Sequence, residues 1–166
     1  MIHRPTGQAA DFGLLPATAD HFSRMMAGQG FDGVAPASTP VADVAVLGML
    51  AGLAETISAQ FAPAAWIMVA DGEAVGLLSI TALADDGAVQ IGYGVAPGSQ
   101  GCGYAGAAVA ALLDLFRDDE RVIAVVAETR TDNIPSQRVL ERNGFAMTGE
   151  RFDEEDGDLL SWRFQF

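Results

Sequence analysis

The sequence predicts an α+β fold (α/β in the broad sense) in which helices flank a mixed central sheet. Three observations lead to this prediction. Three strand-like runs joined by tight turns occupy residues 64–95. A glycine-rich loop, an apolar helix and a β-branched strand follow as a strand–helix–strand unit. A second helix and two more strand-like runs complete the chain. The 166 residues, half of them hydrophobic, suit a single domain spanning residues 1–166.

Two helices are expected before the first strand-like run. Thr18 can accept a hydrogen bond as the N-cap of a short helix that begins near Ala19. The longer run "TPVADVAVLGMLAGLAETISAQF" places Thr39 as the expected N-cap of a second helix, with Pro40 at its first position.

The three strand-like runs have the alternation and turn signals of an antiparallel meander. Asp71–Gly72 is the residue pair of a two-residue hairpin turn. In the third run, alternation places Val89, Ile91 and Tyr93 on one face and Gln90 on the other, so Tyr93 is expected to lie mostly in the core. The runs comprise residues 64–70, 74–83 and 88–95.

A strand–helix–strand unit and a further helix follow. The helix expected over Tyr104–Arg117 carries apolar residues at i, i+3, i+4 and i+7, which indicates one buried face. The strand at residues 122–128 is apolar throughout, as in a strand covered on both faces. A last helix spans Ile134–Asn143 and ends at Gly144 as a left-handed residue. Two strands joined by "DEEDGD" close the chain.

Composition excludes several classes of function. The formal net charge is −13 and the nine basic residues are scattered, so no nucleic-acid partner is expected. No apolar run is long enough to span a bilayer, and the first 13 residues lack the apolar core of a signal peptide, so no membrane association is expected. One cysteine rules out an internal disulfide and a cysteine-based zinc site, and no metal is expected. These features indicate a cytoplasmic protein. The acidic surface either attracts a cationic substrate such as an amine or serves solubility alone.

The loop "QGCGYAG" supports two interpretations. Gly101, Gly103 and Gly106 match G-x-G-x-x-G, and Glu128 stands where the dinucleotide fingerprint has its ribose-binding acid, which would suit an NAD(P)-binding oxidoreductase. Pro97 interrupts the strand before the loop, which this interpretation does not expect. Alternatively, the loop presents backbone N–H groups at a helix N-terminus to another anion, and Gly106 serves helix packing.

Two motifs together resemble the GNAT superfamily of acyl-CoA-dependent N-acetyltransferases. "GYGVAPGSQGCGYAGAAVAALLDLF" is similar to the family's [QR]-x-x-G-x-[GA] motif, with Gln100, Gly103 and Ala105 at the specified positions. "NIPSQRVLERNGF" resembles the second motif, N-x-x-S followed by a helix and G-F. Serine in that motif resembles the branch that includes the ribosomal-protein N-terminal acetyltransferases.

The resemblance implies acetyl-CoA as cosubstrate and a V-like cleft between two central strands of a mainly antiparallel sheet. Loop amides would hold the pyrophosphate, and the main chain of Val95 would pair with the pantetheine arm. Asn133 would bond that arm, although it also suits a helix N-cap. The family also implies a homodimer formed through the last strands. The expected cofactor-binding residues are Val95, Gln100, Gly101, Cys102, Gly103, Tyr104, Ala105, Asn133 and Ser136.

Acyl transfer to an amine needs a base, and the sequence departs from the commonest family pattern there. Gln90 stands where many members have a glutamate. Glu128, at the end of the neighbouring strand, is the expected substitute, acting directly or through a water. Glu128 is equally well explained as a solvent-exposed residue at the end of its strand, with no catalytic role. Asp85 and Asp86 are weaker candidates, since they suit a turn.

The acid that assists the leaving thiol also departs from the pattern. Leu140 occupies the position where many members have a tyrosine, and the resemblance gives the role to Ser136. Backbone amides near Val95 would stabilise the oxyanion. Cys102 lies at the pyrophosphate end of the loop and is not expected to act as a nucleophile.

The sequence therefore predicts an N-acetyltransferase that moves an acetyl group from acetyl-CoA to a primary amine by direct attack. The acceptor is a small molecule or a protein N-terminus. Gln90 and Leu140 leave a second hypothesis, a catalytically weak acyl-CoA-binding domain that acts as a sensor or interaction module. The NAD(P)-binding oxidoreductase is the third.

Overall fold

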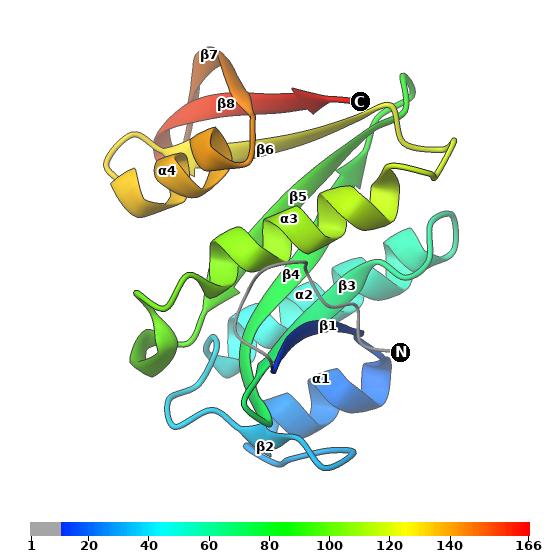
Figure 1. The fold of residues 1–166 in the computed structure, drawn as a ribbon, viewed down its shortest axis with the longest axis vertical. Coiled ribbons are helices and arrows are strands. Elements are labelled where there is room, and N and C mark those ends of the chain that lie inside the picture. The colour runs from blue at the N-terminus through cyan, green and yellow to red at the C-terminus, as the bar shows by residue number, and fades with distance from the viewer. Residues whose placement is uncertain (1–10) are drawn as a thin grey trace.

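The computed structural model describes residues 11–166, in which one sheet is covered by helices on both faces (Figure 1). The segment used to argue against a signal peptide falls almost wholly outside the described residues. The helices are α1 (Ala19–Met26), α2 (Val44–Ser58), α3 (Tyr104–Phe116) and α4 (Ile134–Arg142), with a 3-10 turn, η1, at Pro97–Ser99. The strands are β1 (Phe12–Pro16), β2 (Ala35–Pro36), β3 (Ala65–Ala70), β4 (Glu73–Leu83), β5 (Ala88–Val95), β6 (Ala124–Arg130), β7 (Ala146–Asp153) and β8 (Gly157–Gln165).

The strand order confirms the predicted mixed, mainly antiparallel sheet. The order is β1-β3-β4-β5-β6-β8-β7, with β2 paired to β4 at one end. Neighbours along this path are antiparallel except β5 and β6, which are parallel because α3 carries the chain back between them. The hairpin predicted at Asp71–Gly72 is present, and both residues have positive φ, as a type I′ turn requires.

Each face of the sheet has its own apolar core, because side chains alternate along the strands. On β4, Leu78 and Ile80 pack with the α3 face, whereas Leu77 points to the other side. The predicted buried stripe of α3 lies in the first core, together with Leu140 of α4. Helices α1 and α2 cover the opposite face, with Phe22 and Leu47 in the second core.

The N-terminal helices are partly as predicted. Thr18 caps α1, and its Oγ1 accepts from the His21 N–H at 3.2 Å. The prediction that Thr39 caps α2 is wrong: the helix begins four residues later, where Asp43 Oδ1 accepts from Val46 N–H at 2.9 Å. A carboxylate at a helix N-terminus gains from the helix dipole, and the Thr39 hydroxyl is engaged elsewhere, accepting from the Gly98 N–H at 2.8 Å.

Two strands were not predicted. β1 is five residues long and ends in a proline, and β2 is two residues long and also ends in one, so neither has a clear period of alternation. Their pairing with β3 and β4 determines their conformation.

The parallel pair β5–β6 opens partway along its length, which is the predicted V-like cleft. Pairing begins at Ala88 with Ala124 and ends at Ile91 with Ala127. Beyond that pair, β5 continues to Val95 and β6 to Arg130 without bonding to each other. The main chains at the ends of both strands are therefore available to other partners.

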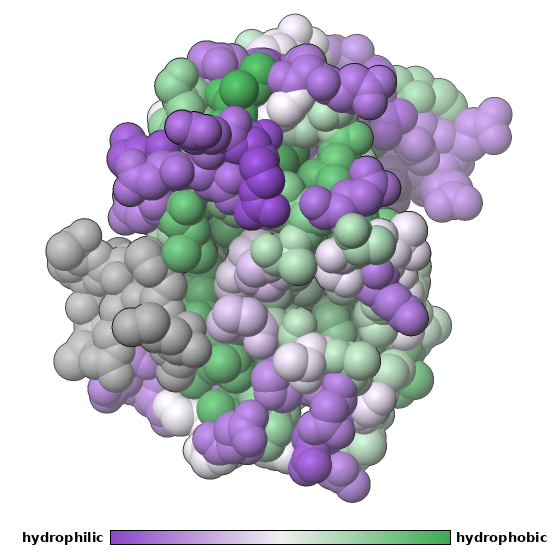
Figure 2. Space-filling view, turned by 90° about the vertical axis from the view of Figure 1, so that its right-hand side faces the viewer, coloured by the Kyte–Doolittle hydropathy of each residue, from purple (hydrophilic) through white to green (hydrophobic). Residues whose placement is uncertain are grey.

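Hydrophilic and apolar residues occupy different parts of one side of the molecule. Figure 2 shows the side of the molecule that lies at the right in Figure 1, with hydrophilic residues over its top and bottom and apolar residues between them. None of the helices within residues 11–166 has the length and apolar character needed to cross a membrane.

The close approach of β4 and β5 beside the cleft requires glycine at position 76. A Cβ at Gly76 would lie 2.6 Å from Met68 Sδ and 2.7 Å from the Gly94 carbonyl oxygen, whereas one at Gly94 would meet nothing within 4 Å. We expect Gly76→Ala to lower the free energy of unfolding by about 1–3 kcal/mol through overpacking. The matched Gly94→Ala should change it by less than about 0.5 kcal/mol. Urea denaturation measures both, and equal stabilities of the two variants would contradict this packing argument.

Candidate functional site

The glycine loop presents backbone N–H groups at the start of α3 that have no hydrogen-bond partner within residues 11–166. Gly101 and Gly103 have φ values of 77° and 80°, in the left-handed region that favours glycine. Gly103 is the N-cap residue, and no side chain in the described part of the chain caps the helix. Because the first N–H groups of a helix lack intrahelical partners, this end carries positive potential. The loop can therefore hold an anion by its main chain alone.

A groove of about 470 Å³ extends from this loop between β5 and α4. It brings together residues that are far apart in the sequence, the loop on one side and the first turn of α4 on the other. Cys102 does not line the groove and is exposed. The predicted cofactor-binding residues that line it are Val95, Gln100, Gly101, Gly103, Tyr104, Ala105, Asn133 and Ser136.

Gly106 also lines this groove, so the prediction that it serves the packing of α3 against the sheet is wrong. A Cβ at this position would meet nothing within 4 Å. Its carbonyl oxygen accepts from Asn143 Nδ2 at 3.3 Å, which links α3 to the end of α4.

The Gln100 side chain holds the loop against the end of β5. Its Nε2 donates to the Val95 carbonyl oxygen at 3.2 Å. Since a carbonyl oxygen has two lone pairs, Val95 can still accept a second hydrogen bond. Gln100 thus shapes the loop through its contact with the strand.

Asn133 is the N-cap of α4, as one of the two sequence interpretations has it. Its Oδ1 accepts from the Ser136 N–H at 3.3 Å. An asparagine amide also has two donors on Nδ2, and the cap uses only the oxygen. The two predicted roles, N-cap and ligand-binding residue, are therefore compatible.

A hydroxyl pair crosses the groove from β5 to α4. The Tyr93 hydroxyl lies 2.9 Å from Ser136 Oγ, where either oxygen can be the donor, and 3.3 Å from the Ser136 carbonyl oxygen, a second acceptor for the phenol proton. Burial raises the pKa of Tyr93 above its ordinary value, and the bond with Ser136 opposes that shift. The ring packs on the core, as predicted, but the hydroxyl lines the groove. Alternation alone could not reveal this, because it does not show where β5 and β6 separate.

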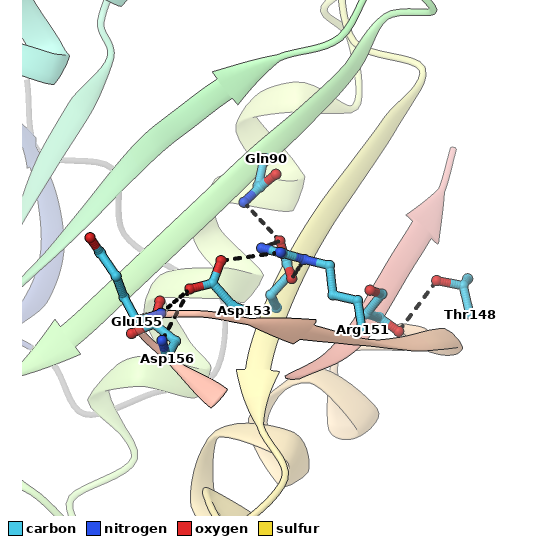
Figure 3. A network of polar contacts seen from close by, with 8 residues as sticks. Gln90, Thr148, Arg151, Asp153, Glu155 and Asp156 are labelled. Carbon is cyan, nitrogen blue, oxygen red and sulfur yellow. Dashed lines mark hydrogen bonds and ion pairs between the residues drawn. The ribbon is translucent and has the colours of Figure 1, made fainter. Parts of the chain in front are cut away.

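A charged cluster lies on the other face of the same cleft (Figure 3). Glu128 is the first residue of β6 beyond the last pair with β5, and alternation places it on the face opposite Ala127 and the α3 core. Arg151 of β7 donates to both its oxygens, from Nε to Oε2 at 2.6 Å and from Nη2 to Oε1 at 3.1 Å. Gln90 Nε2 approaches Oε1 at 3.5 Å. The sequence placed Glu128 and Gln90 together but did not reveal Arg151, which comes from a distant strand.

The guanidinium of Arg151 lies between two carboxylates. Its Nη1 contacts Asp153 Oδ2 at 3.2 Å, and Asp153 Oδ1 accepts the N–H groups of Glu155 and Asp156 at 2.9 and 3.0 Å. These two backbone bonds are the main cause of the lowered pKa of Asp153, and the bond to Glu128 is the main cause of the raised pKa of Arg151. The turn between β7 and β8 therefore fixes Arg151, which in turn fixes Glu128.

The face of β5 that carries Gln90 has no further side chains toward the cleft. Gly92 and Gly94 follow at alternate positions on that face, and Gly94 is exposed. The weaker candidates for the base lie elsewhere: Asp85 and Asp86 sit in the β4–β5 turn, where Asp86 Oδ1 accepts from the Ala88 N–H at 3.0 Å. The arrangement thus has a hydroxyl pair on one face of the cleft and a carboxylate on the other.

Comparison with known proteins identifies the class. Residues 15–146 match the family model for the acetyltransferase (GNAT) domain. The chain therefore belongs to the GNAT acetyltransferase family. This membership favours an acyl-CoA loop over the dinucleotide interpretation of G-x-G-x-x-G. Among curated proteins nothing matches.

Solved structures share the fold. RimL, a ribosomal L7/L12 alpha-N-protein acetyltransferase in complex with coenzyme A, is 20% identical, with a TM-score of 0.72 over 95% of this chain and 96% of that one. RimJ of Mycobacterium smegmatis in complex with CoA-disulfide is 24% identical, with a TM-score of 0.68 over 93% and 81%. The microcin self-immunity acetyltransferase MccE, in complex with acetyl-CoA and AMP, is 14% identical, with a TM-score of 0.72 over 95% and 94%.

The stability of Asn133 variants, measured without ligand, reports the capping role of this residue separately from any role in ligand binding. Asparagine and aspartate are equally good N-caps, whereas alanine is not. We expect Asn133→Ala to lower the free energy of unfolding by about 1 kcal/mol, and Asn133→Asp to leave it within about 0.3 kcal/mol. Urea denaturation without ligand measures both variants, and an alanine variant as stable as the wild type would show that the cap contributes nothing.

Proposed function

We propose that the protein transfers an acetyl group from acetyl-CoA to a primary amine, by direct attack of the amine on the thioester. One observation carries the proposal most strongly. The uncapped N-terminus of α3, with Gly101 and Gly103 in left-handed conformations, opens into a groove that ends at a separated pair of parallel strands. Membership of the GNAT family makes acetyl-CoA the donor that this groove is expected to hold.

The residues of the groove suit the parts of acetyl-CoA. The amides of Gly101, Gly103, Tyr104 and Ala105 hold the pyrophosphate, and they carry this task alone because the loop has no lysine or arginine. The main chain of Val95 pairs with the pantetheine arm in the manner of an added strand. Asn133 Nδ2 donates to the same arm.

The acceptor is expected to approach from the other face of the cleft, over Gly92 and Gly94. The Glu128 side chain lies on that face. A protein N-terminus is the favoured acceptor on two grounds. An α-amine has a pKa of about 7.7–8.0 and loses its proton far more easily than a lysine side chain at about 10.4. A further solved structure of the same fold, 18% identical, is an acetyltransferase from Salmonella typhimurium that modifies the N-terminal serine of the ribosomal subunit protein L7/L12.

The chemistry follows from these positions. Glu128 takes the amine proton through a water, since its side chain is 21% exposed and held in place by Arg151. The nitrogen lone pair attacks the carbonyl carbon, and backbone amides near Val95 stabilise the oxyanion. The C–N bond forms, the C–S bond breaks, and its electron pair leaves on sulfur. Ser136 Oγ donates a hydrogen bond to the departing thiolate.

One observation favours a second function, the binding of acyl-CoA without acyl transfer. Both oxygens of Glu128 are bonded to Arg151, which would suit a domain that binds acyl-CoA without transferring the acyl group. Turnover with an amine acceptor separates the two functions.

We place this activity in the cytoplasm, in a single domain that forms a homodimer. The edge strand β7 supports the dimer, since it exposes Met147 and Phe152 to 55% and 71% and an edge strand offers unpaired main-chain groups.

The donor and the reaction are tested together. Thiol release from acetyl-CoA should depend on a peptide with a free N-terminus and should be absent with the same peptide already acetylated. Gly103→Ala and Gly72→Ala form a matched pair, because both glycines have positive φ and open space around them. Each should cost about 1 kcal/mol of stability, but only Gly103→Ala should weaken acetyl-CoA binding, at least tenfold, by displacing the loop amides. Calorimetric titration measures binding, and stabilisation by NAD but not by CoA would overturn the proposal.

The base is tested with a second matched pair. Glu128→Gln removes the proton acceptor and should lower kcat by about 10²-fold or more, with acetyl-CoA affinity unchanged. Arg151→Gln removes the same ion pair but keeps the carboxylate, so it should lower kcat less than Glu128→Gln does, the remaining loss reflecting a base that is no longer held in place. Steady-state kinetics across pH measures both variants. An unchanged rate and pH profile in Glu128→Gln would show that another group is the base.

A further inference from the structure

The hydroxyl pair Tyr93–Ser136 contains a group that the proposed reaction does not use. Ser136 stands at the first turn of α4, and Tyr93 reaches it from β5 across the groove, 2.9 Å from hydroxyl to hydroxyl. Both side chains line the groove for the donor. Leu140, one turn further along α4, is fully buried in the core and has no hydroxyl to offer.

We propose that Tyr93 is a positioning residue for acyl transfer, whose phenol holds the Ser136 hydroxyl so that the serine proton points into the groove toward the leaving sulfur. This inference rests on the proposed function. It assigns to Tyr93 a role that neither its alternation in the strand nor its packing on the core requires.

Either hydroxyl can donate in this 2.9 Å contact, and the proposal requires Tyr93 to be the donor. A serine hydroxyl has one proton and rotates freely, so an isolated Ser136 can turn its proton toward any acceptor. The Tyr93 hydroxyl is a donor within reach of two acceptors on Ser136, the carbonyl oxygen at 3.3 Å and Oγ at 2.9 Å, and the shorter contact is the stronger bond. When the phenol donates to Oγ, the serine proton is left for a third partner in the groove.

The role of the phenol is to donate a hydrogen bond and not to give up its proton. Burial raises the pKa of Tyr93, so the phenol stays protonated throughout the range in which amines are acetylated. The electron pair of the broken C–S bond therefore stays on sulfur, stabilised by the Ser136 hydroxyl. No proton leaves either residue, and the thiolate is an adequate leaving group because a thiol is far more acidic than an alcohol or an amine, the cysteine thiol having a pKa of about 8.5.

The kinetic test removes one hydroxyl at a time. Tyr93→Phe should lower kcat about tenfold, with the Kd for acetyl-CoA within about twofold, because a hydrogen bond to a developing charge is lost. Ser136→Ala should lower kcat at least as much. In the double variant, Tyr93→Phe should add nothing to the loss caused by Ser136→Ala, since Tyr93 acts only through that hydroxyl.

Thr129→Val is the matched structural control. Thr129 is buried on β6, and its Oγ1 accepts from Trp162 Nε1 at 3.0 Å, away from the groove. This variant removes a comparable hydroxyl contact and should lower the Tm without lowering kcat. A fall in kcat in Thr129→Val equal to that in Tyr93→Phe would mean that general loss of stability explains both, and would overturn the proposal.

A second measurement requires no turnover. The ultraviolet absorbance of the CoA thiolate, followed against pH in the complex with wild-type protein, should show a thiol pKa below the value measured for free CoA in the same buffer. In Tyr93→Phe that pKa should rise toward the value for free CoA, while CoA remains bound. A purely structural role for Tyr93 would not produce this shift.

The outcomes separate the two proposals. If the wild type binds no CoA, the proposed function and the role of Tyr93 both fail. If CoA binds and amines are acetylated, but Tyr93→Phe changes neither kcat nor the thiol pKa, only the role of Tyr93 fails. If Tyr93→Phe lowers kcat equally with and without Ser136, Tyr93 acts by a route other than the serine, and the proposal is wrong.

Discussion

The end of the β5–β6 pairing at Ile91 and Ala127 is the constraint on which the candidate site depends. Parallel strands that remained paired to their ends would satisfy each other's main chain and leave no passage between the two faces of the sheet. Because they separate, β5 can offer its edge to an extended ligand. The same separation puts Tyr93 within reach of α4 on one face and leaves Glu128 open on the other.

The two faces of the cleft are held by different physical means. The donor face relies on main-chain geometry, namely left-handed glycines, an uncapped helix and the cap of α4. The opposite face relies on charge, with Arg151 fixed between Glu128 and Asp153 and the latter fixed by the β7–β8 turn. The strands β5, β6 and β7 and the helices α3 and α4 therefore meet at one place, which brings together motifs that lie about 30 residues apart in the sequence.

The sequence predicted the parts of this protein whose signals are local. The α3 stripe, the Asp71–Gly72 hairpin, the Thr18 cap and Gly144 follow from spacing and backbone preference, and the structure has them. The start of α2, the strands β1 and β2, Arg151 and the contact of the Tyr93 hydroxyl with Ser136 escaped prediction because long-range contacts determine them. Thr39 is one example: its hydroxyl bonds to Gly98, 59 residues away, instead of capping the nearby helix.

The absence of cationic side chains from the glycine loop has a consequence for the way a polyanion meets this surface. With a net charge of −13, the protein repels a phosphate-bearing molecule at long range, and attraction begins only where the amide dipoles are near. Dissolved ions screen the long-range repulsion, but they weaken the short-range attraction between the amide dipoles and the phosphate much less. Moderate ionic strength therefore assists association here, the reverse of its effect on a phosphate site built from lysine and arginine.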